Sequence, residues 1–145
     1  MKVIIYTDGG SRGNPGEAAV GVVILSERGE TIKAYGQCIG VATNNQAEYQ
    51  AVIFALEKIK LLFSKREAAR LKIDFRLDSE LVVKQLNHQY KIKESEIQKT
   101  FLKLWNLMPD FGEITFTHIL RGQNKQADRL VNEALDGAKN ENSLF

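Results

Sequence analysis

Four acidic residues stand in comparable places in the sequence, each beside a run of apolar residues. They are Asp8, Glu48, Asp78 and Asp128. Two of them follow apolar runs typical of strands, and the other two begin segments with the apolar spacing of amphipathic helices. Gathered in one place, four carboxylates would supply the all-oxygen ligands that Mg²⁺ and Mn²⁺ prefer. A pair of such ions suits in-line displacement at a phosphoryl group.

Each of these acids also has an ordinary structural explanation when it is taken alone. Glu48 and Asp128 would be favoured by the dipole of the helix that they begin. Asp78 could take part in a helix cap, and an aspartate before glycine, as at Asp8, is common in turns. Gathered without cations the four would repel, because two unit charges about 4 Å apart cost about 4 kcal/mol at an effective dielectric constant of 20. The metal-site hypothesis therefore depends on one topology bringing all four together.

The first acid is followed by a glycine-rich stretch, residues 9–16. Residues 2–7 are mostly β-branched or aromatic, which predicts a buried strand that delivers Asp8 to its end. The Gly-Gly-Ser that follows predicts a turn in which main chain can approach another molecule closely. Pro15 and Gly16 suit the central positions of a type II turn.

The elements that must position the acids follow one another along a single domain, residues 1–138, with a polar tail at 139–145. Strands are expected at 2–7, 18–26, 31–39, 71–77 and 113–119, and helices at 44–63, 79–87, 94–108 and from 124 onward. Thr43 and Gln46 fit a capping box for the first helix. The order predicts an α/β fold with one mixed sheet. A parallel pairing of strands 2–7 and 71–77 through the long helix would make Asp8 and Asp78 neighbours.

Composition agrees with an ordinary globular domain and excludes several other classes. The chain has 145 residues, of which 43% are hydrophobic and 26% charged, with a net charge of +2. No apolar run reaches the roughly 18 residues of a membrane span, so no membrane partner is expected. Met1 leads directly into the first strand, which predicts a cytoplasmic protein without a signal peptide. Cys38 is the only cysteine, which excludes an intrachain disulfide and a cysteine-rich zinc site.

Four segments resemble type 1 ribonuclease H. They are YTDGGSRGNPG, TNNQAEYQAVIFAL, RLDSELVVKQL and HILRGQNKQADRLVNEAL, which occur in the order and spacing of that family and span residues 1–138. The resemblance implies the ribonuclease H-like fold, a five-stranded mixed sheet in the order 3-2-1-4-5 flanked by helices. It also implies hydrolysis of the RNA strand of RNA–DNA hybrids with two metal ions. The acidic tetrad of the family falls on Asp8, Glu48, Asp78 and Asp128.

On this resemblance we hypothesise that Asp8 bridges two Mg²⁺ ions, for which Mn²⁺ could substitute. Glu48 and Asp78 would hold the ion nearer the leaving 3′-oxygen. Asp128 would help to hold the ion that lowers the pKa of the attacking water. The products would carry 5′-phosphate and 3′-hydroxyl ends, and the protein is expected to act as a monomer.

The resemblance also implies contacts with the two strands of the substrate. The residues that match contacts to the RNA backbone and its 2′-hydroxyl groups are Gly9, Gly10, Ser11, Asn14 and Gln46. Those that match contacts to the DNA strand are Thr43, Asn44 and Asn45. In the basic loop 88–93, Tyr90 could stack on a sugar and Lys91 could contact a phosphate, and an ordinary exposed loop is the alternative.

The sequence departs from the family pattern in the loop before the last acid. Many members carry a mobile histidine there that is proposed to help product leave, whereas residues 120–124 contain none. Arg121 is the nearest candidate substitute, and the arrangement resembles a branch common in archaea and some bacteria. His118 falls in an expected strand. The tryptophan-rich basic protrusion of several bacterial members is absent, and Trp105 is expected in the core.

Three alternative functions stay open at this point. A nuclease of broader range would also cut double-stranded RNA. A non-catalytic nucleic-acid-binding module would be expected to lack one of the acids, and all four are present. A 3′–5′ exonuclease of the same general fold would carry Asp-x-Glu on its first strand, whereas residue 10 is glycine.

Overall fold

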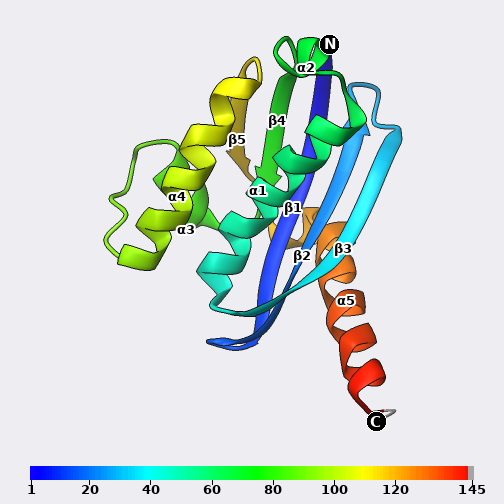
Figure 1. Ribbon diagram of the computed structural model, residues 1–145, viewed down its shortest axis with the longest axis vertical. Coiled ribbons are helices and arrows are strands. Elements are labelled where there is room, and N and C mark those ends of the chain that lie inside the picture. Colours follow the sequence, from blue (N-terminus) through cyan, green and yellow to red (C-terminus); the bar gives the residue numbers. More distant parts are fainter. Residues whose placement is uncertain (144–145) are drawn as a thin grey trace.

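The computed structural model describes the main chain of residues 1–143 and the side chains of residues 1–138. Its strands are β1 (Lys2–Gly13), β2 (Gly16–Ser26), β3 (Thr31–Ala42), β4 (Lys72–Leu77) and β5 (Ile114–His118). Its helices are α1 (Asn44–Leu62), α2 (Lys65–Ala68), α3 (Glu80–Leu86), α4 (Ser95–Leu107) and α5 (Lys125–Ser143), with the 3₁₀ helices η1 (Met108–Asp110) and η2 (Arg121–Gln123). The expected order of strands and long helices is confirmed (Figure 1).

The five strands form one mixed sheet in the order β3-β2-β1-β4-β5, as the family resemblance implies. β1, β2 and β3 form an antiparallel meander, and β4 lies parallel to both β1 and β5. The parallel register ends at Thr7 opposite Leu77. The predicted pairing of the first and fourth strands is therefore confirmed, and Asp8 and Asp78 follow directly after the last paired residues.

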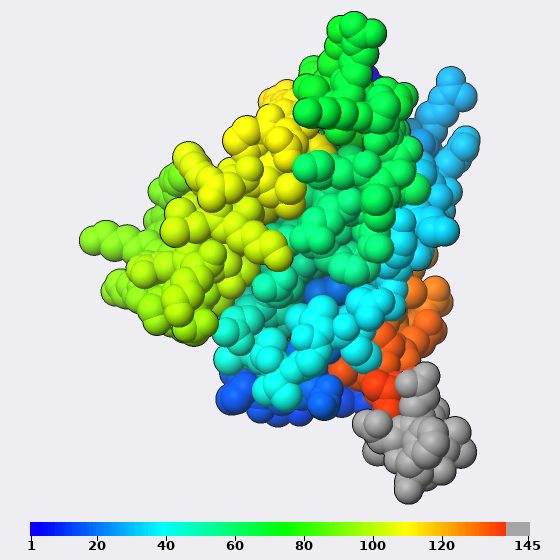
Figure 2. Space-filling view, viewed as in Figure 1, coloured from blue at the N-terminus to red at the C-terminus, as the bar shows by residue number. Residues whose placement is uncertain are grey.

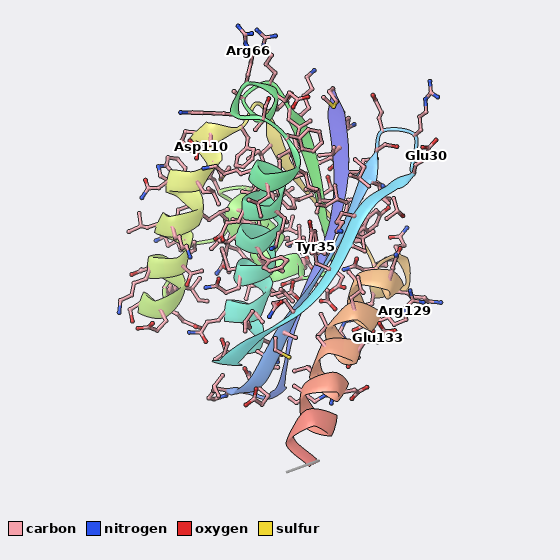
Figure 3. The ribbon with its side chains drawn as sticks, turned by 45° about the vertical axis from the view of Figure 1, so that its right-hand side comes forward. Glu30, Tyr35, Arg66, Asp110, Arg129 and Glu133 are labelled. Atoms are coloured by element: carbon pink, nitrogen blue, oxygen red, sulfur yellow. The ribbon has the colours of Figure 1, made fainter. Side chains whose placement is uncertain are left out.

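Helices cover both faces of the sheet (Figure 3). α1 packs on one face, where its buried residues Tyr49, Val52 and Ile59 join a large apolar core with Phe75 of β4. α5 packs against β2 and β3 around a smaller cluster that includes Val131. The N-terminus of α1 carries the predicted capping box, in which the Gln46 N–H donates to Thr43 Oγ1 (3.2 Å) and the Thr43 N–H donates to Gln46 Oε1 (2.8 Å).

Two glycines allow both helices to approach the sheet backbone to backbone. A Cβ on Gly9 would lie 2.2 Å from the main-chain oxygen of Ala47 in α1. A Cβ on Gly21 would lie 2.2 Å from the main-chain oxygen of Ala127 in α5. Real side-chain carbons do not come that close, so these positions require glycine. Glu48 and Asp128 directly follow Ala47 and Ala127 in the chain.

The expected turn after Asp8 is wrong, because β1 continues as strand to Gly13. Beyond Thr7, β1 has lost its partner β4 but stays paired with β2 as far as Gly13 opposite Gly16. The type II turn is also wrong: Asn14 and Pro15, joined by a cis peptide bond, form the two-residue loop of this hairpin. A glycine-rich composition therefore marks a strand with close neighbours here, rather than a turn.

Two further differences concern helices. α2 was not predicted, although its N-terminus has a capping box between Ser64 and Glu67. α5 continues through Gly137 to Ser143, and of the expected tail, residues 144–145 lie outside the described part. In the part of the chain described here, no helix is both long and apolar enough to cross a membrane.

Candidate active site

One open cavity of about 460 Å³ collects the four acids at the edge where β4 ends. Asp8 comes from β1, Asp78 follows β4, Glu48 lies in the second turn of α1, and Asp128 lies in the first turn of α5. All four line the cavity. The topology therefore brings together the residues that the sequence analysis selected, although each comes from a different element.

Three of the acids form a tight group within this cavity. Asp8, Glu48 and Asp78 each offer a carboxylate oxygen, and these oxygens all lie within 4.8 Å of one another. Asp8 and Glu48 are buried, and Asp78 is half-buried. Asp128 stands outside this group with an exposed side chain, so it occupies the mouth of the cavity rather than its floor.

No basic side chain that the structure describes forms an ion pair with the carboxylates of this group. Burial, together with the charge of Asp78, raises the pKa of Asp8 from 3.8 to about 7. Burial also raises the pKa of Glu48 well above its ordinary value of 4.5, and the charges of Asp8 and Asp78 act in the same direction. Oε2 of Glu48 is buried without a hydrogen-bond partner among the described residues. Oxygen donors that repel one another and include an unpartnered buried atom fit a site for divalent cations.

Two arginines also line the cavity. Arg121 belongs to η2 and is exposed, so the candidate substitute for the missing loop histidine does lie at the site. Arg12, which the sequence analysis did not select, forms an ion pair with Asp136 (2.7 Å) in α5. The two cations stand at the rim, where a polyanion would pass.

The predicted RNA-side and DNA-side residues lie around the start of α1. Five of them line the cavity with the acids: Gly9, Gly10, Ser11, Asn44 and Asn45. Asn14, Thr43 and Gln46 do not line it. Asn14 nevertheless contacts a residue that lines the cavity, because the Asn44 N–H donates to Asn14 Oδ1 (3.0 Å). Figure 2 shows the β1–β2 loop (dark blue) beside the end of β3 and the start of α1 (cyan) on the surface of the molecule.

Tyr90 and Lys91 are not brought to the acids. Tyr90 lines a separate, mostly apolar groove with His88 and Trp105, and Lys84 Nζ stands 4.9 Å from the centre of its ring. The expectation of a core position for Trp105 is wrong, because 51% of this residue is exposed. α4 is amphipathic and buries Ile97 and Leu104, which leaves Trp105 on the groove side of the helix.

Comparison with known proteins agrees with this geometry. The family described as Reverse transcriptase-like matches residues 6–134. The ribonuclease H of Ruthia magnifica subsp. Calyptogena magnifica is 33% identical over 150 residues, which cover 93% of this chain and 96% of that protein. The chain belongs to the ribonuclease H family.

Other members of the ribonuclease H family are more similar. The ribonuclease HI of Halobacterium salinarum is 42% identical over 137 residues, or 94% of this chain and 66% of that protein. A crystal structure of LC11-RNase H1 in complex with RNA/DNA hybrid has a TM-score of 0.89 at 43% identity, covering 94% of this chain and 98% of that chain. The chain spans 66% of the Halobacterium relative and 36% of three mycobacterial relatives.

The site also contains residues that sequence reasoning missed. Asn124 was expected only as the start of the last helix, yet its side chain donates a hydrogen bond to Asp78. Asn132 lines the cavity and donates from Nδ2 to the main-chain oxygen of Asp128 (3.0 Å). The spacing of residues 124, 128 and 132 was the available signal, because residues four apart share one face of a helix.

Proposed function

We propose that this protein is an endonuclease that hydrolyses the RNA strand of RNA–DNA hybrids. The observation that carries the proposal is the group of three carboxylates within 4.8 Å in an open cavity, in a member of the ribonuclease H family. The LC11-RNase H1 structure, which is bound to RNA/DNA hybrid, supports the choice of substrate, because this chain aligns with 98% of it. The protein would act as a monomer in the cytoplasm.

Asp8, Glu48, Asp78 and Asp128 would hold two Mg²⁺ ions, for which Mn²⁺ could substitute. When bound, divalent cations neutralise phosphate charge and favour the ionisation of water at neutral pH. Asp8 would be central to this set, because its carboxylate lies within 4.8 Å of those of Glu48 and Asp78, and the charges of Asp78 and Asp128 both raise its pKa. The exposed Asp128 would face the side from which water enters.

The rest of the cavity would bind and orient the hybrid. Gly10 and Ser11 present strand main chain to the cavity, which would suit contact with the RNA backbone. Asn14 and Gln46 would read 2′-hydroxyl groups, which distinguish RNA from DNA. Thr43, Asn44 and Asn45 would meet the DNA strand. Arg121 at the rim would contact a phosphate and be released with the product, and Tyr90 and Lys91 would contact only a longer duplex.

A cleavage assay with internally and end-labelled duplexes tests the proposal. RNA–DNA, RNA–RNA and DNA–DNA duplexes of one sequence are compared with and without Mg²⁺, with Asp8→Asn as the inactive control. We expect internal cuts in the RNA strand of the hybrid that leave 5′-phosphate and 3′-hydroxyl ends. Stepwise release of mononucleotides, equal cutting of all duplexes, or full activity in Asp8→Asn would each contradict the proposal.

A further inference from the structure

Asn124 is a deeply buried polar residue beside the acids, with 1% of its surface exposed. Its Nδ2 donates two hydrogen bonds, one to the main-chain oxygen of Thr7 (2.8 Å) and one to Oδ2 of Asp78 (2.9 Å). Its main-chain oxygen accepts from the N–H of Asp128 (3.1 Å). One residue therefore joins the three elements that carry Asp8, Asp78 and Asp128.

The direction of the Asn124 amide is determined by these partners. A main-chain carbonyl and a carboxylate can only accept, so the group that faces them must be the NH₂ and not the oxygen. The opposite atom, Oδ1, is buried without a hydrogen-bond partner among the residues described. A helix-capping asparagine would use Oδ1 to accept from the first turn. The side chain is thus committed to Asp78 and Thr7, rather than to the helix that it begins.

We propose that Asn124 is a positioning residue that fixes the direction of the Asp78 carboxylate and thereby sets the affinity of the site for divalent cations. The proposal rests on the metal-binding role of the acids in the proposed function. The Nδ2 hydrogen bond occupies one side of Asp78 Oδ2 and holds the carboxylate within reach of Asp8 and Glu48. Removal of such a supporting partner typically weakens metal binding about 10- to 100-fold.

The test measures Mg²⁺ binding by titration calorimetry without nucleic acid, and thermal unfolding without metal. The variants are Asn124→Ala and the nearly isosteric Asn124→Leu, which keeps the volume if the smaller residue prevents folding. The matched control is Asn87→Ala, because Asn87 Nδ2 also bonds a main-chain oxygen of another element, that of Phe116 (3.0 Å), away from the cavity. A third readout is the Mg²⁺ concentration that gives half-maximal cleavage.

We expect both Asn124 variants to bind Mg²⁺ about 10- to 100-fold more weakly and to need correspondingly more Mg²⁺ for cleavage. Asn87→Ala should lose stability. Its Mg²⁺ affinity should stay within about twofold of the wild type, because a hydrogen bond lost far from the cavity is not coupled to the metal site. If the Asn124 variants only lose stability, as Asn87→Ala does, the positioning role is overturned and the proposed function stands. If the wild-type protein itself does not bind Mg²⁺, both proposals fail.

Discussion

The main-chain N–H of Asn44 donates a hydrogen bond to Oδ1 of Asn14 (3.0 Å), and Oδ1 of Asn44 accepts from the N–H of Ser11 (2.9 Å). These two bonds join the end of the β1–β2 hairpin to the first residue of α1. Because Ser11 and Asn44 also line the cavity, the hairpin and the helix present one rigid surface to a bound strand.

We expect Asn14→Ala to raise KM for an RNA–DNA hybrid up to about tenfold, because a hydrogen bond worth about 1 kcal/mol no longer holds this surface. The value of kcat should change less than KM, since the acids keep their places. The control is Glu30→Ala, in the hairpin at the opposite end of the sheet (Figure 3). Equal kinetics for Asn14→Ala and wild type would show that substrate binding does not depend on the hydrogen bond between Asn14 and Asn44.

In the absence of metal, stability should fall as the pH rises from about 4 to about 7. The pKa of Asp8 is about 7 in the folded protein and near 3.8 when the chain unfolds, so the folded state binds the extra proton in this range. Unfolding free energy therefore decreases with pH, by up to about 4 kcal/mol for a shift of this size. Thermal unfolding with a chelator across this range measures the slope.

Asp8→Asn should flatten this slope, and saturating Mg²⁺ should reduce or reverse it by stabilising the charged carboxylates. A wild-type protein whose chelated form gains stability between these pH values would contradict the assignment of the buried acids. Glu48 contributes in the same direction, because its pKa is also raised by burial.

Neutralising a buried acid and an exposed acid should affect stability differently. Glu48→Gln neutralises a carboxylate whose Oε2 is buried and unpartnered within the described chain. The free energy of unfolding of the metal-free variant should therefore rise by about 1–3 kcal/mol. Asp128→Asn removes an exposed charge and should change stability by less than about 0.5 kcal/mol. Both variants should lose cleavage. Urea titration of the chelated proteins compares them, and an equal effect would argue against a buried site.

Gly9→Ala should be far more damaging than an ordinary glycine substitution. The new Cβ would meet the Ala47 carbonyl at 2.2 Å, and the backbone of α1 can only move away. We expect a loss of about 3 kcal/mol or more together with loss of cleavage, because Glu48 moves with the helix. Gly137→Ala is the control, since no atom lies within 4 Å of its Cβ position, and it should gain up to about 1 kcal/mol.

Local signals predicted much of the framework. The capping box of Thr43 and Gln46 predicts the start of α1. The apolar spacing after Glu48 predicts which side of that helix is buried. The parallel pairing of β1 with β4 follows from the length of the crossover between them. These predictions succeed because each depends on a few neighbouring residues or on a strong topological rule.

Tertiary contacts explain what could not be predicted. Gly9 and Gly10 look like a turn in the sequence, but their lack of side chains serves the approach of α1 and α5 to a continuing strand. Asn124 looks like a helix cap, but its amide is used by Asp78, 46 positions away in the chain. Trp105 looks like a core residue in the sequence, but it is half exposed in a groove that α4 forms with the loop before it.

The four acids come from elements that are widely separated in the chain, with Asp8 in the first strand and Asp128 in the last helix. A ribosome that adds roughly 5–20 residues per second needs about 6 to 24 s to pass from one to the other. Throughout that time the emerging polypeptide lacks at least one of the four acids. The order of synthesis therefore delays the completion of this acidic cavity until most of the described residues have been made.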